Sequence, residues 1–112
     1  MNVTNPWCFK LPTTVTFGAG CLAQLPAIAA ARGARPMLVA DRDLVRLPLF
    51  ARVQAVLPGV PVFSDVTPDP TVASVDALAA QLRAGSHDVV IAVGGGSAMD
   101  CAKAAACLAV GN

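Results

Sequence analysis

One segment near the end of the chain, residues 88–110, constrains the fold more than any other. It reads "DVVIAVGGGSAMDCAKAAACLAV" and joins a β-branched apolar run to an alanine-rich run through Gly94, Gly95 and Gly96. Glycine loses more backbone entropy on folding than any other residue, so three together need a physical reason. A buried strand that turns directly into a helix is the repeating unit of α/β folds. The segment therefore predicts an α/β structure in which this turn needs a backbone without side chains.

The same alternation runs along the rest of the chain. Segments with the apolar pattern of strands alternate with segments whose apolar residues recur at helical spacing. This alternation is typical of a parallel sheet built from strand–helix–strand units, so we predict one Rossmann-like α/β layer structure. The expected strands are 14–17, 36–40, 61–66 and 88–93, and the expected helices are 21–33, 48–59, 72–85 and 98–110.

Local signals set the ends of these helices. Pro26 suits a first turn, so the first helix is free to begin after Cys21. Gly33 stands where a left-handed residue often follows a helix, and Thr71 is the expected N-cap of the third helix. The apolar face of that third helix is predicted to consist of Val72, Val75, Leu78, Ala79 and Leu82.

The composition excludes several classes of protein. Of the 112 residues, 55% are hydrophobic and 13% are charged, which is not the composition of a disordered charged tail. The net charge is +1, without a Lys/Arg cluster, and only 4% of the residues are aromatic. We therefore expect no nucleic-acid partner. The sequence has no apolar run of about 18 residues and no signal-peptide pattern, so we expect no membrane partner either.

The four cysteines, Cys8, Cys21, Cys101 and Cys107, lack the spacing of zinc sites. Cys101 and Cys107 fall in the alanine-rich helical run and are expected to be small buried residues. Reduced thiols of this kind indicate a cytoplasmic protein.

The glycine turn has the features of a phosphate site. Ligand sites of parallel α/β sheets lie at the carboxyl ends of the strands, and the turn follows the run 88–93, which we expect to be a central strand covered on both faces. A helix N-terminus presents free N–H groups and a partial positive charge, which bind phosphate where no Cβ atom blocks the approach. Ser97 adds a hydroxyl donor. The turn therefore predicts a phosphate or dinucleotide site.

Structural explanations of the same residues stay open. Ser97 and Asp100 fit the S-x-x-D pattern of a capping box, which merely starts a helix, and glycine can serve only to make a tight turn. The two best-known phosphate loops do not match: Met99 occupies the third glycine position of G-x-G-x-x-G, and the P-loop pattern is absent.

Four stretches together resemble one enzyme family. "GGGSAMDCAKAAA" resembles the GGGSxxDxAK signature of the iron-containing (group III) alcohol dehydrogenases. "TFGAG" (16–20), "MLVAD" (37–41) and "TPDPT" (67–71) are similar to the family's FGxG stretch, its second strand with a terminal Asp, and its P-x-P-T segment. The order and spacing agree through nearly the whole chain.

The resemblance implies an oxidoreductase that transfers a hydride between NAD(P) and a small-molecule alcohol or aldehyde. In this family an N-terminal, dehydroquinate synthase-like α/β domain holds the dinucleotide. A separate helical domain holds a divalent metal, Fe or Zn, through one Asp and three His. The parent enzyme is expected to be a homo-oligomer.

Carried over residue by residue, the resemblance assigns a cofactor site and no catalytic or metal-binding residue in this chain. Asp41 would meet the adenosine ribose, which favours NAD over NADP, since a 2′-phosphate would face a like charge. Asp69 would lie beside the adenine. Gly95, Gly96 and Ser97 would contact the pyrophosphate, and Asp100 and Lys103 would lie near the nicotinamide side.

Each of these assignments has a plainer alternative. Asp41 and Asp69 are also ordinary turn residues, and Asp100 is also a helix cap. Lys103 can simply pair with Asp100 on the helix surface. His87, the only histidine, is expected to be a solvated loop residue.

One histidine cannot supply a three-His metal site. We therefore expect residues 1–112 to be the N-terminal portion of a dinucleotide-binding domain, without the metal-binding helical domain, and inactive when isolated. A glycerol dehydrogenase or dehydroquinate-synthase-like NAD enzyme, and a non-catalytic nucleotide-binding remnant, are the alternatives.

Overall fold

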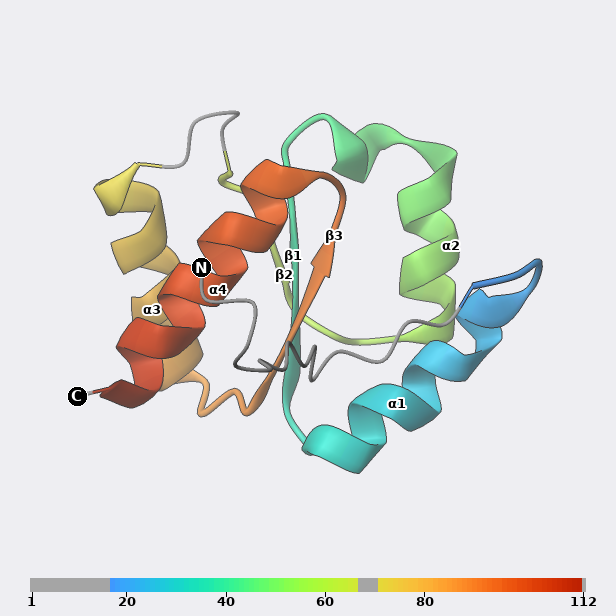
Figure 1. Ribbon diagram of the computed structural model, residues 1–112, viewed down its shortest axis with the longest axis horizontal. Coiled ribbons are helices and arrows are strands. Elements are labelled where there is room, and N and C mark those ends of the chain that lie inside the picture. The colour runs from blue at the N-terminus through green and yellow to red at the C-terminus, as the bar shows by residue number, and fades with distance from the viewer. Residues whose placement is uncertain (1–16, 67–70, 112) are drawn as a thin grey trace, which may run out of the picture.

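A computed structural model describes residues 17–66 and 71–111 of the chain. Helices and strands alternate within these ranges, as the sequence predicts (Figure 1). The elements are η1 (Cys21–Gln24), α1 (Leu25–Arg32), β1 (Pro36–Ala40), η2 (Leu44–Arg46), α2 (Pro48–Val56), β2 (Val62–Phe63), α3 (Val72–Ala84), β3 (Val89–Val93) and α4 (Gly96–Gly111).

The three strands form one parallel sheet in the order β2-β1-β3. β1 pairs with β3 along its whole length, from Pro36 opposite Val89 to Ala40 opposite Val93. The prediction that 88–93 is a central strand is wrong for the described residues, because β1 lies at the centre and β3 lies at an edge. Within β3 only Val89 is buried, and the other four residues are partly exposed. The expected α/β Rossmann-like fold is confirmed.

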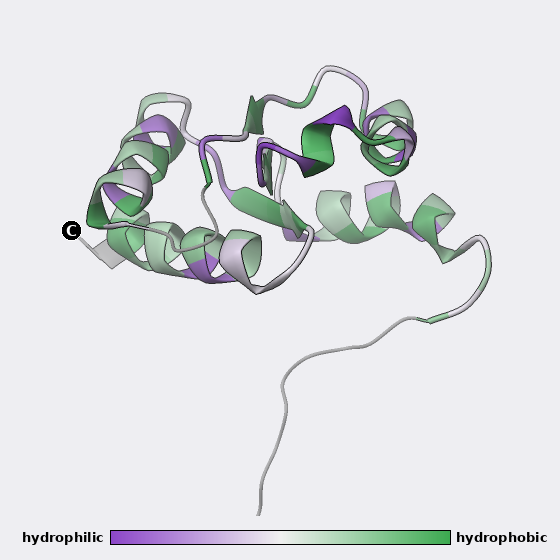
Figure 2. Ribbon diagram, turned by 90° about the horizontal axis from the view of Figure 1, so that it is seen from above, coloured by the Kyte–Doolittle hydropathy of each residue, from purple (hydrophilic) through white to green (hydrophobic). Residues whose placement is uncertain are grey.

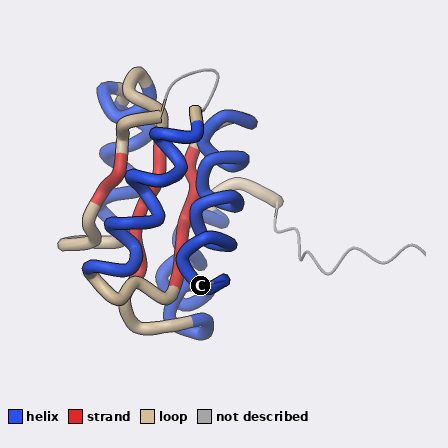
Figure 3. The backbone as a smooth tube through the Cα atoms, turned by 90° about the vertical axis from the view of Figure 1, so that its left-hand side faces the viewer, coloured by secondary structure: helices blue, strands red, loops and turns tan. Residues whose placement is uncertain are grey.

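Helices cover both faces of the sheet (Figures 1 and 3). α3 and α4 lie on one face, where Met37 and Val39 of β1 join a core with Leu78, Leu82 and Cys101. α1 and α2 lie on the other face, where Leu38 and Ala40 of β1 join Phe50, Val53 and Leu57. Successive side chains of a strand point to opposite faces, so the single strand β1 supplies both cores.

The hydropathy of the ribbon follows this layering (Figure 2). The strands are green, and the helices carry both green and purple residues. Three members of the expected apolar face of α3, namely Leu78, Ala79 and Leu82, are buried. Val72 is not, since it is 78% exposed. It is the first residue of the helix and lies more than a turn before the buried positions.

Three further expectations differ from the structure, and a fourth lies mostly outside the described residues. The strand expected over 61–66 shrinks to Val62–Phe63, although Val66 is buried. Residues 14–16 of the strand expected over 14–17 lie outside the described residues. Gly33 ends α1 with extended backbone, at a φ of 176°, and is not left-handed. Cys107 is exposed, because the helical period places it opposite the buried face of Cys101 and Ala105.

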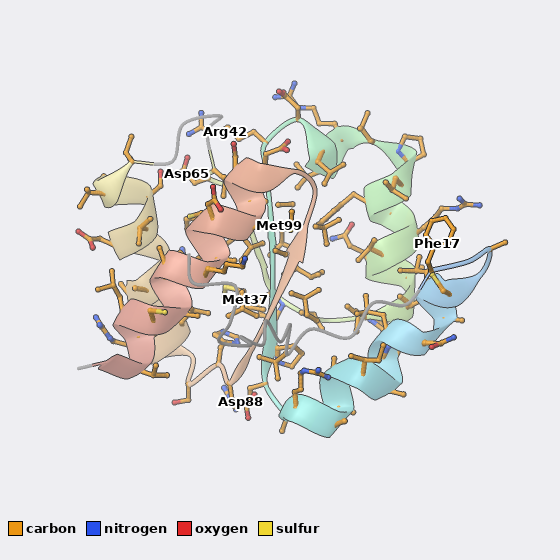
Figure 4. The ribbon with its side chains drawn as sticks, viewed as in Figure 1. Phe17, Met37, Arg42, Asp65, Asp88 and Met99 are labelled. Carbon is orange, nitrogen blue, oxygen red and sulfur yellow. The ribbon has the colours of Figure 1, made fainter. Side chains whose placement is uncertain are left out.

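Asp88 ties the amino-terminal end of the sheet together. Its carboxylate accepts hydrogen bonds from the backbone N–H groups of Ala34 and Arg35, at 3.1 and 2.8 Å. These two bonds lower the pKa of Asp88 from its ordinary value. A Cβ atom at Gly33 would lie 2.5 Å from this carboxylate, so the close approach explains that glycine. Asp88 lies at the end of the sheet opposite the glycine turn (Figure 4).

Within residues 17–66 and 71–111, none of the helices combines the length and the hydropathy that a bilayer-spanning segment needs.

Candidate functional site

The carboxyl ends of β1 and β3 lie side by side and carry the predicted site residues. Ala40 pairs with Val93, so the next residue of each strand, Asp41 and Gly94, meet at the same edge of the sheet. A Cβ atom built on Gly94 would lie 3.6 Å from Oδ2 of Asp41. The structure therefore brings together two stretches that are more than fifty residues apart in the sequence.

Gly94 is the glycine that makes the turn. Its φ is 127°, a region that L-residues with side chains rarely adopt. A Cβ atom there would also lie only 3.2 Å from Cδ2 of Leu44. The turn from β3 into α4 thus requires glycine at this one position.

The fold does not require glycine at positions 95 and 96. Neither has a positive φ among the backbone angles of the described residues. A Cβ atom on either would meet nothing within 4 Å. The fold therefore leaves both positions open, directly before and at the first residue of α4. Their bare backbone suits the approach of a ligand to the helix N-terminus.

The helix begins earlier than the capping-box explanation requires. α4 starts at Gly96, and the N–H of Met99 donates to the carbonyl of Gly95 at 3.3 Å. Gly95 is therefore the N-cap, and Ser97 lies inside the first turn. Asp100 is the fifth helical residue, too far along to cap the helix. The S-x-x-D pattern of Ser97 and Asp100 is therefore displaced into the helix from the positions of a capping box.

Asp41 serves the local fold and also faces the site. Its Oδ1 accepts a hydrogen bond of 2.7 Å from the N–H of Leu44, which holds the turn that leads into η2. The plainer explanation, a strand-end turn residue, is thus correct for one carboxylate oxygen. The side chain also lines a cleft, so the two roles coexist.

This cleft has a volume of about 490 Å³ and lies at the carboxyl ends of the strands. Asp41 and Ser97 line it together, although one follows β1 and the other lies in α4. Arg42, Leu44 and the buried Val66 complete much of its wall, together with Asp43 and Leu47. Sequence reasoning did not assign Arg42 or Val66 to the site: the only signals are that Arg42 comes shortly after one expected strand and that Val66 is the last residue of another.

Asp100 and Lys103 lie away from this cleft. Both are exposed on α4, and among the ion pairs of the described residues none joins them. Lys103 lines a separate hollow of about 310 Å³ with Met99 and Ala102 of α4 and two residues of β3. It therefore belongs to the β3 side of the turn, and Asp41 to the β1 side. Asp69 lies outside the described residues.

The part of the chain that the structure covers contains no group of three His, Cys, Asp or Glu side chains placed to hold a metal ion. The histidine, His87, lies at the opposite end of the sheet, where its Nδ1 is 3.1 Å from the carbonyl oxygen of Arg35. It is a partly exposed residue of the loop between α3 and β3.

Comparison with known proteins gives one consistent result. The family model of iron-containing alcohol dehydrogenases matches residues 12–111. A 1-propanol dehydrogenase from Citrobacter freundii is 38% identical over 99 residues, which are 86% of this chain and 26% of that protein. A long-chain-alcohol dehydrogenase from Geobacillus thermodenitrificans is 42% identical over 98 residues, which are 83% of this chain and 25% of that protein.

A solved structure shares the fold as well as the sequence. It is a sulfoacetaldehyde reductase from Bifidobacterium kashiwanohense in complex with NAD⁺. The similarity has a TM-score of 0.80 at 36% identity and covers 90% of this chain and 28% of that one. The chain thus spans about a quarter of the length of the curated relatives it matches.

Proposed function

Because this chain belongs to the family of iron-containing alcohol dehydrogenases, we propose that it forms part of the NAD(P) site of an oxidoreductase acting on a small alcohol or aldehyde. The cleft that Asp41 and Ser97 share would hold the adenosine half of the cofactor. When bound, the cofactor accepts a hydride from an alcohol or gives one to an aldehyde. The NAD⁺ complex of the related sulfoacetaldehyde reductase supports the choice of cofactor.

One observation carries this proposal: Gly95 and Gly96 are open positions that the fold itself does not need as glycine. A pyrophosphate that approached the first turn of α4 would need this missing bulk. The N–H groups at the start of that helix would donate to the phosphate oxygens, and Ser97 lies in the same turn. The helix dipole favours the negative charge of the phosphates there.

Asp41 would orient the adenosine ribose. Its carboxylate is held by the Leu44 N–H and faces the turn at Gly94, so it is fixed before any ligand arrives. A carboxylate at the end of a strand accepts hydrogen bonds from ribose hydroxyls in dinucleotide folds. The same charge would repel a 2′-phosphate, so we propose a preference for NAD.

The metal of the family does not fit the described residues, since these bring no set of ligating side chains together. No role in metal chemistry is therefore assigned to any of them. Asp100 and Lys103, on the other side of the glycine turn, stay assigned to the nicotinamide side of the cofactor by resemblance alone.

Chemical-shift mapping of the ¹⁵N-labelled chain tests the proposal. Titration with NAD⁺ should shift the amide signals of Gly95, Gly96 and Ser97, and those of the loop at Asp41. The amides of Ala34 and Arg35, bound by Asp88 at the opposite end of the sheet, should stay unchanged and serve as the internal control. Shifts confined to that opposite end, or no shifts at millimolar NAD⁺, would exclude the proposed site.

A further inference from the structure

An ion pair crosses the ends of two strands at the rim of the cleft. Arg42 follows β1 and lines the cleft, and its Nη2 contacts Oδ1 of Asp65, which follows β2 (Figure 4). It is the one ion pair among residues 17–66 and 71–111. Two loops of the sheet edge are thus joined by a guanidinium and a carboxylate.

Stability does not explain this pair. Both side chains are 61% exposed, and exposed pairs in water contribute little to the free energy of unfolding. The contact does have a chemical effect, because the hydrogen bond and the charge of Asp65 raise the pKa of Arg42. Arg42 therefore stays protonated, and the carboxylate of Asp65 offsets part of the charge that Arg42 presents at the cleft.

The position of Arg42 makes this neutralisation relevant to the cofactor. Arg42 directly follows Asp41, and both line the same cleft. An arginine near the strand-end acid is the residue that accommodates the 2′-phosphate of NADP in dinucleotide folds. Arginine suits phosphate because its planar fork donates two parallel hydrogen bonds. Among the described residues that line the cleft, Arg42 is the only basic one.

Arg42 is outnumbered by acids at this rim. Asp41 and Asp43 line the same cleft, and Asp65 engages its guanidinium. A 2′-phosphate that reached the ribose subsite would have to displace Asp65 from Arg42 before it gained a cationic partner. It would do so beside two further carboxylates.

We propose that Asp65 is a second determinant of cofactor choice: by pairing with Arg42 it withholds the cation that a 2′-phosphate needs, and so acts with Asp41 to select NAD over NADP. This inference rests on the proposed function, since it concerns the adenosine end of that same site. Asp65 is a positioning residue in this role, because it acts on the cofactor through Arg42.

Calorimetric titration of the 112-residue chain with NAD⁺, NADP⁺, ADP and adenosine 2′,5′-bisphosphate tests it. Asp65→Asn keeps the shape of the side chain and removes its charge, and Asp65→Ser gives a second variant if the first folds poorly. The ratio of the Kd for NADP⁺ to that for NAD⁺ should fall about tenfold, the value of one gained charge-assisted hydrogen bond. The ratio of the Kd for adenosine 2′,5′-bisphosphate to that for ADP should fall in the same way.

Two controls separate the ion pair from general electrostatics. Asp76→Asn removes the same charge from an exposed position of α3 and should leave the ratio unchanged. Arg42→Gln combined with Asp65→Asn should abolish the tenfold gain, because the guanidinium is then missing.

The outcomes separate the role of Asp65 from the proposed function. If NAD⁺ binds but Asp65→Asn leaves the ratio unchanged, or the gain persists without Arg42, or Asp76→Asn gives the same gain, the role of Asp65 is overturned and the proposed function stands. If the wild-type chain binds none of the four nucleotides, the proposed function is overturned and the role of Asp65 falls with it.

Discussion

The three glycines of the turn should respond to substitution in opposite ways, although they are adjacent. Gly94→Ala places a side chain on a residue whose φ is 127° and whose Cβ would lie 3.2 Å from Leu44. Holding a residue with a side chain in so sparsely populated a backbone region costs about 1–3 kcal/mol. Gly94→Ala should therefore lower the free energy of unfolding by about that amount.

Gly96→Ala should do the reverse. Its Cβ would enter open space, and the residue begins α4, where alanine is the better helix former. Replacing glycine by alanine at a compatible position stabilises a protein by about 0.4–1 kcal/mol, chiefly by restricting the unfolded chain. The fold should gain stability from a change that damages the proposed site.

Binding of NAD⁺ should move in the opposite direction to stability. The added Cβ of Gly96→Ala, and the branched side chain of Gly95→Val, would occupy the space that a phosphate needs at the helix N-terminus. Loss of one hydrogen bond to a charged group is worth about 1.5–3 kcal/mol, or at least about tenfold in Kd.

Urea denaturation and calorimetric titration of the three variants give both quantities. If Gly96→Ala and Gly95→Val fold and bind NAD⁺ as well as the wild type, the proposal that a phosphate binds against Gly95 and Gly96 is refuted. If Gly94→Ala unfolds at the wild-type urea concentration, the reasoning about the turn is refuted.

Three further predictions concern single side chains. Asp41→Asn keeps an acceptor for the Leu44 N–H and removes the charge, so it should reduce the discrimination against NADP⁺ with little loss of stability. Asp41→Gly should reduce both the discrimination and the free energy of unfolding, and equal Kd values for NAD⁺ and NADP⁺ in the wild type would contradict the role of Asp41. The pKa of Asp88 is lowered in the folded chain, so its contribution to stability is present above the ordinary carboxyl range near pH 4 and is lost as the pH falls through the lowered value. In Asp88→Asn, the free energy of unfolding should therefore fall less steeply between pH 5 and 2, roughly the range over which such a carboxylate titrates. The same steepness in the variant and the wild type would show that other groups control the acid dependence. Thr71 accepts a hydrogen bond of 3.1 Å from the N–H of Ser74, so Thr71→Ala should cost about 1 kcal/mol in urea denaturation, whereas Thr71→Ser should retain most of the stability; equal losses in both would argue against the cap.

The sequence predicts the elements of this fold better than their surroundings. The β1 run, the Thr71 cap and the glycine turn depend on local chemistry, and all three appear where the pattern places them. The position of β3 at an edge could not be predicted, because its apolar pattern does not say which strand lies beside it.

The site divides in the same way. The meeting of Asp41 and Gly94 follows from two local patterns and the rule that parallel strands end at one edge. The ion pair of Arg42 and Asp65 spans 23 residues and depends on side-chain directions in two loops, which no local pattern encodes. Gly33 likewise looked like a helix terminator, whereas its neighbour Asp88 lies 55 residues further along the chain.

The order of the strands has a consequence for where a ligand can enter. The chain passes from β1 to the neighbouring β2 through α2 on one face, then returns over β1 to β3 through α3 on the opposite face. The loop after β1 therefore leaves toward one face, and the loop after β3 turns into α4 on the other. At such a reversal of winding direction the two loops diverge, and a crevice opens between strand ends that are hydrogen-bonded neighbours. Asp41 and the glycine turn lie on opposite sides of this crevice.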